Sequence, residues 1–118
     1  MIAQKFRFHG HASLNYVFRN GAGGRSRLFA VKYVANPHRR CPRLAVVVSK
    51  KVFKSAAKRN RLRRRIYEIA RPLVVQAARP TDVVVSVYSP EALELSHQDL
   101  VMQLLPLLHA AGLRQAGV

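Results

Sequence analysis

The longest amphipathic segment of this chain covers residues 50–71, where apolar positions recur every three or four residues. That spacing is typical of a helix with one apolar stripe, wide enough to dock on a sheet. Ser55 is suited to cap its start, and Pro72 disfavours helical geometry in the residue before it, so the helix is predicted to end or bend at Arg71. The stripe consists of Leu62, Ile66, Ile69 and Ala70.

Three shorter segments carry strand patterns. Residues 28–34 alternate between two faces and are rich in strand formers. Residues 43–49 form a continuous apolar run between polar neighbours, as expected for a central strand. Residues 81–89 are the other strongly strand-like run, and Pro90 closes it. In the first segment Phe29, Val31 and Tyr33 point one way, and Leu28, Ala30, Lys32 and Val34 point the other.

The segments before these strands are predicted to be a helix and connections. Residues 9–20 are expected to form a helix, with Gly21 suited to the position after its end. The sequence GAGGRSR at 21–27 predicts a flexible turn that carries two arginines. Residues 36–43, with two prolines and three arginines, predict an exposed connection between strands.

The C-terminal part of the chain predicts a last helix. Residues 73–80 fit either a further turn or two of helix or a packed linker, and both stay open. Ser96, with Asp99 three residues on, resembles a capping box ahead of an amphipathic helix that Pro106 is expected to bend or end. The apolar face of that helix consists of Leu100, Leu104, Leu107 and Leu108.

The order of elements is therefore helix, two or three strands, helix, strand and helix, without internal repeats. This order predicts a single α+β domain over residues 1–118, in which helices pack on one mixed sheet. The length suffices for one modest core. The strands at 44–49 and 82–89, with the basic helix between them, form a βαβ-like unit. The general rule makes its crossover right-handed.

Charge is distributed very unevenly along the chain, whose formal net charge is +16. Residues 1–67 hold eighteen Lys or Arg and no acid, whereas residues 68–118 hold three basic and five acidic residues. A merely solvated helix face normally mixes Glu with Lys, and this one does not. A polyanion must neutralise such a surface, and arginine suits bidentate contacts to phosphates. RNA is favoured over DNA, because no helix-turn-helix pair, zinc finger or heptad-bearing basic region is present.

The sequence offers no clear chemical site. Its histidines and single cysteine lack the spacing of a structural zinc site, and its acids do not cluster as a two-metal nuclease requires. No apolar run approaches the roughly 18–20 residues of a membrane span, and the N-terminus lacks a signal-peptide core. We therefore expect a cytoplasmic protein with no catalytic residue, metal ligand or cofactor of its own and no membrane partner. The histidines and cysteine in question are His9, His11, His38 and Cys41.

A second binding surface is predicted between the first helix and the sheet. Asn15, Phe18 and Lys32 could line a groove there, of a width suited to a single strand stacking on an aromatic ring. The helical spacing of Phe18 fits burial in the core equally well, so both interpretations stay open.

The sequence LAVVVSKKV followed by KRNRLRRRIYE, with VFRNG at the end of the first helix, resembles the protein subunit of bacterial ribonuclease P. The resemblance covers residues 6–108, and its most specific parts are SKKV at 49–52 and RNR at 59–61. It implies an αβββαβα sandwich of the ribosomal protein S5 domain 2-like type. In that fold the crossover around the basic helix is left-handed, against the general rule.

The resemblance also implies a function. In that family the RNA subunit cleaves the 5′ leader from precursor tRNA with magnesium ions, while the protein supports the active RNA and holds the leader. The chain would act as a monomer in a one-to-one ribonucleoprotein. The residues expected to contact the catalytic RNA are Lys50, Lys51, Lys58, Arg59, Asn60, Arg61, Arg63 and Arg64. Those expected to line the leader groove are Leu14, Asn15, Phe18, Ala30 and Lys32.

Three positions depart from the pattern of that family. Leu14 and Lys32 stand where aromatic residues are usual, and Tyr88 follows the last strand where an arginine is common. These departures concern the leader groove and its rim, and none touches the basic helix.

Two other functions can be weighed from the residues alone, and only the first is compatible with them. A ribosomal or other structural RNA-binding protein would use an acid-free half in the same way. A self-sufficient nuclease would need the carboxylate cluster that the sequence lacks.

Overall fold

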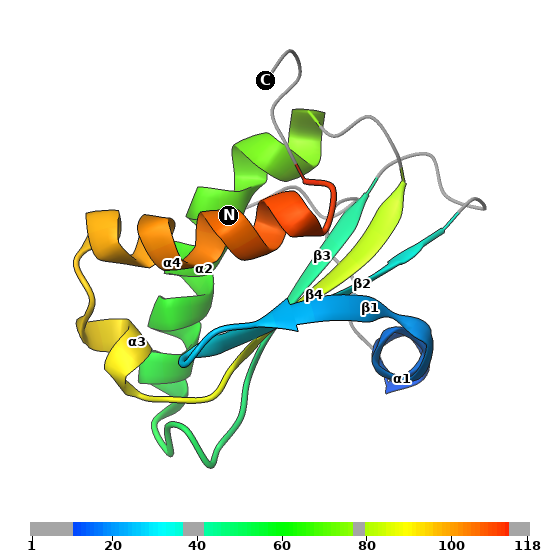
Figure 1. The fold of residues 1–118 in the computed structure, drawn as a ribbon. Helices are drawn as coiled ribbons and strands as arrows, with labels where there is room; N and C mark the ends of the chain where they lie inside the picture. Colours follow the sequence, from blue (N-terminus) through cyan, green and yellow to red (C-terminus); the bar gives the residue numbers. More distant parts are fainter. Residues whose placement is uncertain (1–10, 37–41, 77–79, 114–118) are drawn as a thin grey trace.

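A computed structural model of the chain describes residues 11–36, 42–76 and 80–113, and gives only the backbone of residues 11–13. The predicted order αβββαβα is confirmed, with a one-turn helix added before the last one (Figure 1). The elements are α1 (His11–Asn20), β1 (Ala22–Arg25), β2 (Phe29–Ala35), β3 (Arg43–Val48), α2 (Ala56–Gln76), β4 (Thr81–Val87), α3 (Glu91–Glu94) and α4 (His97–Ala110).

The four strands form one mixed sheet in the order β1-β2-β4-β3. β2 pairs antiparallel with both β1 and β4, and β3 pairs parallel with β4. The prediction that residues 43–49 form a central strand is wrong, because β3 lies at the edge of the sheet. Its continuous apolar run has another cause: both faces of β3 are covered, Leu44 by the larger core and Ala45 by a smaller one.

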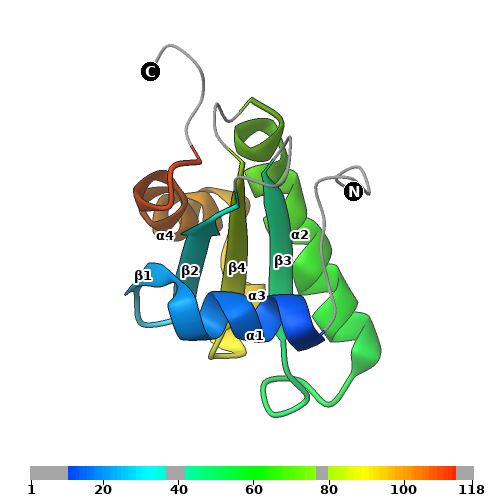
Figure 2. The ribbon, with the colours of Figure 1, turned by 90° about the vertical axis from the view of Figure 1, so that its right-hand side faces the viewer.

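Helices cover the two faces of the sheet unequally. α1 crosses one face, and α2 and α4 pack on the other (Figure 1, Figure 2). The larger core lies between the sheet and α2 and α4, and the smaller core lies under α1. Figure 2 also shows that the β3–α2–β4 crossover is left-handed. The resemblance implied this handedness, and the general rule was wrong here.

The alternation predicted for β2 is confirmed. Phe29 and Val31 are buried in the larger core, whereas Val34 packs against the smaller core under α1. Leu28, predicted to share a face with Val34, is buried in the larger core instead. Leu28 precedes β2, so the alternation of side chains between the two faces of the strand does not apply to it.

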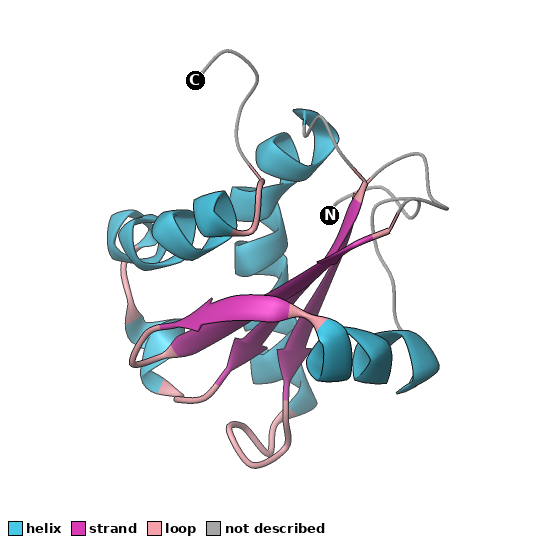
Figure 3. Cartoon of the chain, turned by 45° about the vertical axis from the view of Figure 1, so that its right-hand side comes forward, coloured by secondary structure: helices cyan, strands magenta, loops and turns pink. Residues whose placement is uncertain are grey.

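The prediction that residues 21–27 form a flexible turn is wrong for most of its length. Residues 22–25 are the edge strand β1, which pairs with β2 in a hairpin (Figure 3). Gly23 has no Cβ, and one built there would lie 2.3 Å from the carbonyl oxygen of Val31. Glycine is a poor strand former by itself, but here its missing side chain lets two backbones approach closely.

Gly21 marks a second close approach, between the end of α1 and β2. A Cβ there would lie 2.5 Å from the carbonyl oxygen of Val17 and 2.8 Å from that of Tyr33. We expect Gly21→Ala to lower the free energy of unfolding by about 1–3 kcal/mol, the usual range for overpacking, in urea denaturation. Gly24→Ala is the matched control, because its methyl group would meet only a flexible side-chain atom of Leu107, at 3.2 Å. Equal losses in both variants would contradict this account.

Two prolines lie inside helices and end neither of them. α2 does not end at Arg71 but continues through Pro72, and α4 continues through Pro106. Each proline removes one backbone hydrogen bond. The apolar stripe continues past each of them, since Val74 and Leu108 are fully buried, and this burial offsets the loss. Residues 73–76 are thus helical, whereas residues 77–79 lie outside the described part of the chain.

The two predicted helix caps are confirmed. The Ser55 hydroxyl accepts a hydrogen bond from the backbone N–H of Lys58 at 3.3 Å, and Ser96 accepts one from Asp99 at 3.1 Å. Each bond satisfies a backbone donor that the first turn of a helix leaves without a partner. The first cap fixes where the arginine-rich turns of α2 begin.

A buried ionic network joins the ends of three strands. Asp82 at the start of β4 accepts two hydrogen bonds from Arg43, at 2.9 and 2.8 Å, and one from the Asn36 side-chain amide at 2.9 Å. The Arg43 and Asp82 side chains are only 12% and 7% exposed. The pattern of residues 36–43 predicted an exposed connection, and for Arg43 this prediction is wrong. Residues 37–41 of that segment lie outside the described part of the chain.

Candidate nucleic-acid interface

The loop before α2 and the first turns of that helix present a surface of exposed cations. The sequence contains no acid before Glu68. Within the described part of the chain, no hydrogen bond or ion pair engages the side chains of five of the cations that were predicted to contact RNA. Their charges are available to an external anion. We call this set the α2 cationic surface; it consists of Lys50, Lys51, Lys58, Arg61 and Arg64.

Three other residues predicted to contact RNA are engaged within the protein. Arg59 donates hydrogen bonds to the carbonyl oxygens of Phe53, at 2.7 Å, and Lys54, at 3.0 Å. Arg59 thereby braces the loop that carries the lysines. Asn60 accepts a hydrogen bond from Arg63 at 2.6 Å, so the amide orients a neighbouring guanidinium. These three bonds shape the surface from which the exposed cations project.

Arg65 has a structural role that the charge pattern did not indicate. Its guanidinium donates to the carbonyl oxygen of Leu93 at 2.8 Å and to that of Leu95 at 2.6 Å. These carbonyls lie at the end of α3 and just after it. Arg65 therefore ties α2 to the segment leading into α4, and it does not add to the α2 cationic surface.

The predicted groove beside α1 is only partly assembled from the expected residues. Phe18 is 38% exposed and is not a core residue, which resolves the alternative that the sequence left open. Lys32 reaches from β2 to α1, where its ammonium donates to the carbonyl oxygen of Phe18 at 2.9 Å. Leu14 packs against the smaller core, so its side chain is largely committed to the fold.

A shallow hollow opens beside the β1–β2 hairpin and contains two of the expected groove residues, Ala30 and Lys32. It also contains two residues that the sequence did not single out together. The guanidinium carbon of Arg25 lies 4.7 Å from the centroid of the Tyr88 ring, within the range of a cation–π contact. No sequence signal linked them, because residues 22–25 were not predicted to be a strand. The hollow is lined by Gly21, Gly23, Gly24, Arg25, Ala30, Val31, Lys32 and Tyr88.

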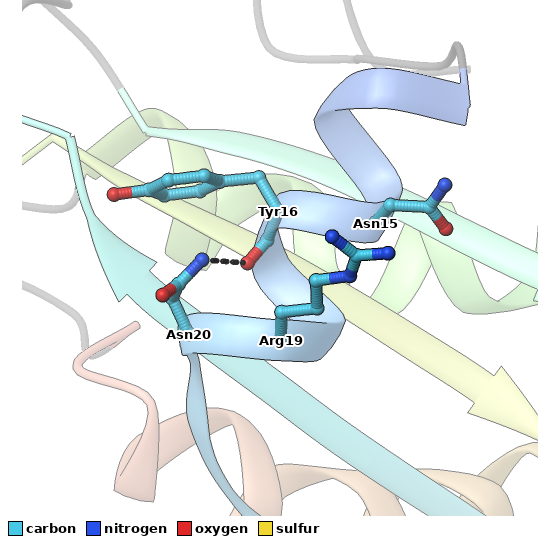
Figure 4. A pocket seen from close by; sticks show the side chains of 4 residues that line it. All are labelled: Asn15, Tyr16, Arg19 and Asn20. Carbon is cyan, nitrogen blue, oxygen red and sulfur yellow. Dashed lines mark hydrogen bonds between the residues drawn. The ribbon is translucent and has the colours of Figure 1, made fainter.

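Asn15 lies on a different shallow pocket, formed by α1 alone (Figure 4). Tyr16, Arg19 and Asn20 line it as well. The Asn20 side-chain amide donates to the carbonyl oxygen of Tyr16 at 3.1 Å, and the Tyr16 side chain is 56% exposed. The structure therefore separates Asn15 from the hollow that holds Ala30 and Lys32.

Two findings concern other classes of site. Within residues 11–36, 42–76 and 80–113, no three His, Cys, Asp or Glu side chains gather where they could hold a metal ion. The candidates His9, His38 and Cys41 lie outside the described residues, as does the side chain of His11. In the same described ranges, none of the helices combines the length and apolar character needed to cross a membrane.

The fold and the α2 cationic surface define a small α+β protein with one strongly basic face. The family model of ribonuclease P matches residues 2–112, and the chain belongs to that family. Two related sequences extend this finding. The chain is 38% identical over 97 residues to the ribonuclease P protein component of Thermus aquaticus. The aligned segment covers 82% of this chain and 55% of that protein. The chain is 29% identical over 123 residues to the ribonuclease P protein component of Synechococcus sp. strain RCC307, with coverages of 96% and 97%.

The chain thus spans little more than half the length of the Thermus relatives it matches, at 55%. Solved structures share its fold. The ribonuclease P protein of Staphylococcus aureus superposes with a TM-score of 0.80 at 24% identity, covering 92% of this chain and 96% of that one. The ribonuclease P protein of Thermotoga maritima gives a TM-score of 0.73 at 25% identity, with coverages of 85% and 92%. These likenesses confirm the fold class expected from the sequence.

Proposed function

We propose that this chain is the protein subunit of a ribonuclease P, in which it binds the catalytic RNA and the 5′ leader of precursor tRNA. The observation that carries the proposal is the α2 cationic surface, an exposed set of cations with no acid before Glu68. An RNA backbone offers closely spaced phosphates that such a surface neutralises, with release of condensed counterions. In this role the chain assists endonucleolytic maturation of tRNA as one partner in a one-to-one ribonucleoprotein.

The leader is proposed to lie against α1 and β2. Phe18 supports this, because its exposed ring offers a stacking surface for an unpaired base. Lys32 supports it as well, because its contact with the Phe18 carbonyl oxygen at 2.9 Å holds a cation beside that ring. Ring and cation together supply the two contacts that single-stranded RNA needs, one to a base and one to a phosphate.

The chemistry in this proposal belongs to the RNA subunit and its magnesium ions. Two of the described carboxylates already have partners within the chain. Asp82 accepts hydrogen bonds from Arg43 and Asn36, and Glu91 pairs with Arg27 at 3.0 Å. The residues of this chain bind and orient RNA.

Adding the chain to its cognate RNA subunit at low magnesium is expected to raise the rate of leader removal from a precursor tRNA. The cations of the protein take over part of the charge neutralisation that magnesium otherwise supplies. The rate is measured by separating leader and mature tRNA on a gel. The chain alone in magnesium is the control, and it should leave the precursor uncut.

Two results would contradict the proposal. One is an unchanged cleavage rate together with unchanged affinity of the RNA subunit for precursor tRNA. The other is purification of the chain from cells in a ribosomal particle at unit stoichiometry, which would favour a structural RNA-binding protein.

A further inference from the structure

The outer face of α1 carries polar side chains that point away from the sheet. On the inner face, Val17 is fully buried and packs with Ala45 and Val84 in the smaller core. Successive residues of an α-helix are turned by roughly 100° about its axis, so Arg19 points almost directly away from the surface on which Val17 packs. Tyr16 also lies on the outer side, and its side chain is 56% exposed. This surface is therefore distinct from the groove between α1 and the sheet.

Four exposed side chains of α1 line the shallow pocket on this outer face (Figure 4). Residues three or four apart on a helix are neighbours, so Arg19 lies next to both Tyr16 and Asn15. Within the described ranges of the chain, no hydrogen bond or ion pair engages the Arg19 guanidinium or the Asn15 side-chain amide. Both groups are thus available to an external ligand. We call this set the α1 outer patch; it consists of Asn15, Tyr16, Arg19 and Asn20.

Contacts of the last turn hold α1 in place on the sheet. The backbone N–H of Gly21 donates to the carbonyl oxygen of Val17 at 2.8 Å and ends the helix. The Lys32 ammonium reaches across from β2 and donates to the carbonyl oxygen of Phe18 at 2.9 Å. Together with the burial of Val17, these bonds fix the turn that carries the α1 outer patch. The patch is therefore positioned before a ligand binds, which lowers the entropy lost on binding.

The chemistry of the α1 outer patch fits an unpaired RNA nucleotide. The exposed ring of Tyr16 offers a stacking surface for a base. The Arg19 guanidinium suits bidentate contacts to a phosphate, and the Asn15 amide suits hydrogen bonds to the edge of an unstacked base. Residues 1–67 contain no acid, so the segments that adjoin α1 in the chain carry no charge that would repel a phosphate. Stacking, phosphate and base-edge contacts are thus available within about one helical turn.

We propose that the α1 outer patch binds an unpaired nucleotide of the catalytic RNA subunit, whose base stacks on Tyr16 and whose phosphate is bound by Arg19. The inference rests on the proposed function, because it takes the RNA subunit as the partner. A leader that lies between α1 and the sheet is on the other side of the helix from Arg19. A structured RNA offers unpaired bases in loops and bulges, where proteins most often recognise it. The chain then holds its RNA subunit at two places, α1 and α2, which cover opposite faces of the sheet (Figure 1, Figure 2).

The experiment uses the full chain and its cognate RNA subunit without any tRNA, so that leader binding does not contribute. Affinity is measured by filter binding over a series of salt concentrations. Tyr16→Ala is expected to weaken binding roughly fivefold or more without changing the salt dependence, and Tyr16→Phe to keep the affinity. Arg19→Ala is expected to lower the slope of log affinity against log salt by about 0.7–0.9, as the loss of one phosphate contact does. Chemical probing of the RNA subunit should show one unpaired nucleotide that the wild-type protein protects and Tyr16→Ala leaves reactive. A merely structural role of α1 would not produce this combination.

Arg71→Ala is the matched control, because it removes another exposed arginine, which already lies 3.9 Å from Glu68. It should change binding less than twofold. The inference is overturned if Tyr16→Ala and Arg19→Ala bind the RNA subunit like the wild type. It is also overturned if these variants weaken only the binding of precursor tRNA to the assembled complex, which would assign the patch to tRNA. Failure of the proposed function looks different: the wild-type protein would then bind the RNA subunit no more tightly than an unrelated RNA of the same length.

Discussion

Replacing Asp82 by alanine is expected to lower the free energy of unfolding by about 3–5 kcal/mol, a large share of the roughly 5–15 kcal/mol typical of a small domain. The carboxylate is 7% exposed and accepts hydrogen bonds from two side chains, Arg43 and Asn36. Its loss leaves the Arg43 guanidinium, which is 12% exposed, beside an apolar methyl group. A buried cation that loses its carboxylate keeps the cost of desolvation and loses the attraction that offset it.

The control for Asp82 is the other close ion pair of comparable length in the described residues, between Arg27 and Glu91. The two pairs have similar separations, 2.8 Å for Arg43–Asp82 and 3.0 Å for Arg27–Glu91, but the second is 75% and 54% exposed. Glu91→Ala is therefore expected to cost about 0–1 kcal/mol, as exposed pairs do. Urea denaturation followed by circular dichroism measures both variants. Similar losses would show that burial does not set the value of the Asp82 network.

A double variant separates the cost of a broken pair from the worth of the intact one. Arg43→Met combined with Asp82→Leu replaces both charges by apolar side chains of similar reach. Such replacements of buried pairs are often neutral or stabilising. The double variant is expected to recover most of the stability that Asp82→Ala loses. If it is as unstable as the single variant, the network holds the strand ends in register in a way that apolar packing cannot replace.

The parts of the fold that the sequence predicted are those in which local pattern and burial agree. The apolar stripe of residues 50–71 predicted α2, and the serine–aspartate pair predicted the start of α4, because both signals are contained in one helix. Each of these helices was predicted to end or bend at its proline, and neither ends there, since α2 continues through Pro72 and α4 through Pro106. The helix-ending tendency of proline reflects the loss of one backbone hydrogen bond. It does not take into account the burial of Val74 and Leu108, which depends on packing against the rest of the fold.

The parts that could not be predicted depend on a partner strand. Residues 22–25 have no strand pattern. They form β1 because they pair with β2 and because Gly23 lets the two backbones approach closely. The contact of Arg25 with Tyr88 depends on that pairing, so the sequence pattern could not predict the contact either. The edge position of β3 was missed because a run covered on both faces looks the same at an edge and in the centre.

The arginines of α2 show a similar limit for the candidate interface. Charge counting treated them alike, but the structure gives them different roles. Arg59 and Arg65 donate to backbone carbonyl oxygens of the chain itself, whereas Arg61 and Arg64 are exposed and engage no described residue. Arg61 and Arg64 can therefore contact a phosphate without breaking any described hydrogen bond or ion pair of the protein. Substitutions should therefore separate RNA binding from stability along a single helix.

The triple variant Lys58→Ala, Arg61→Ala, Arg64→Ala is expected to weaken binding of the cognate RNA subunit and to flatten its salt dependence. Each phosphate contact adds about 0.7–0.9 to the slope of log affinity against log salt, so three lost contacts lower that slope by about 2–3. Stability should change little, because all three side chains are exposed. Filter binding over a series of salt concentrations measures the slope, and urea denaturation measures the stability.

Two further variants test whether the salt dependence of RNA binding comes from the exposed cations of the α2 cationic surface or from any arginine of α2. Arg71→Ala removes an exposed arginine near Glu68, at 3.9 Å, and should leave the slope unchanged, because Glu68 already lies beside that charge. Arg59→Ala should lower stability, by roughly 1.5–3 kcal/mol for each charged hydrogen bond lost, together with RNA affinity, because the loop that positions the lysines loses its brace. An unchanged slope in the triple variant would contradict direct phosphate contact by the α2 cationic surface. Equal slopes in the triple variant and Arg71→Ala would mean that net charge, rather than this surface, attracts the RNA.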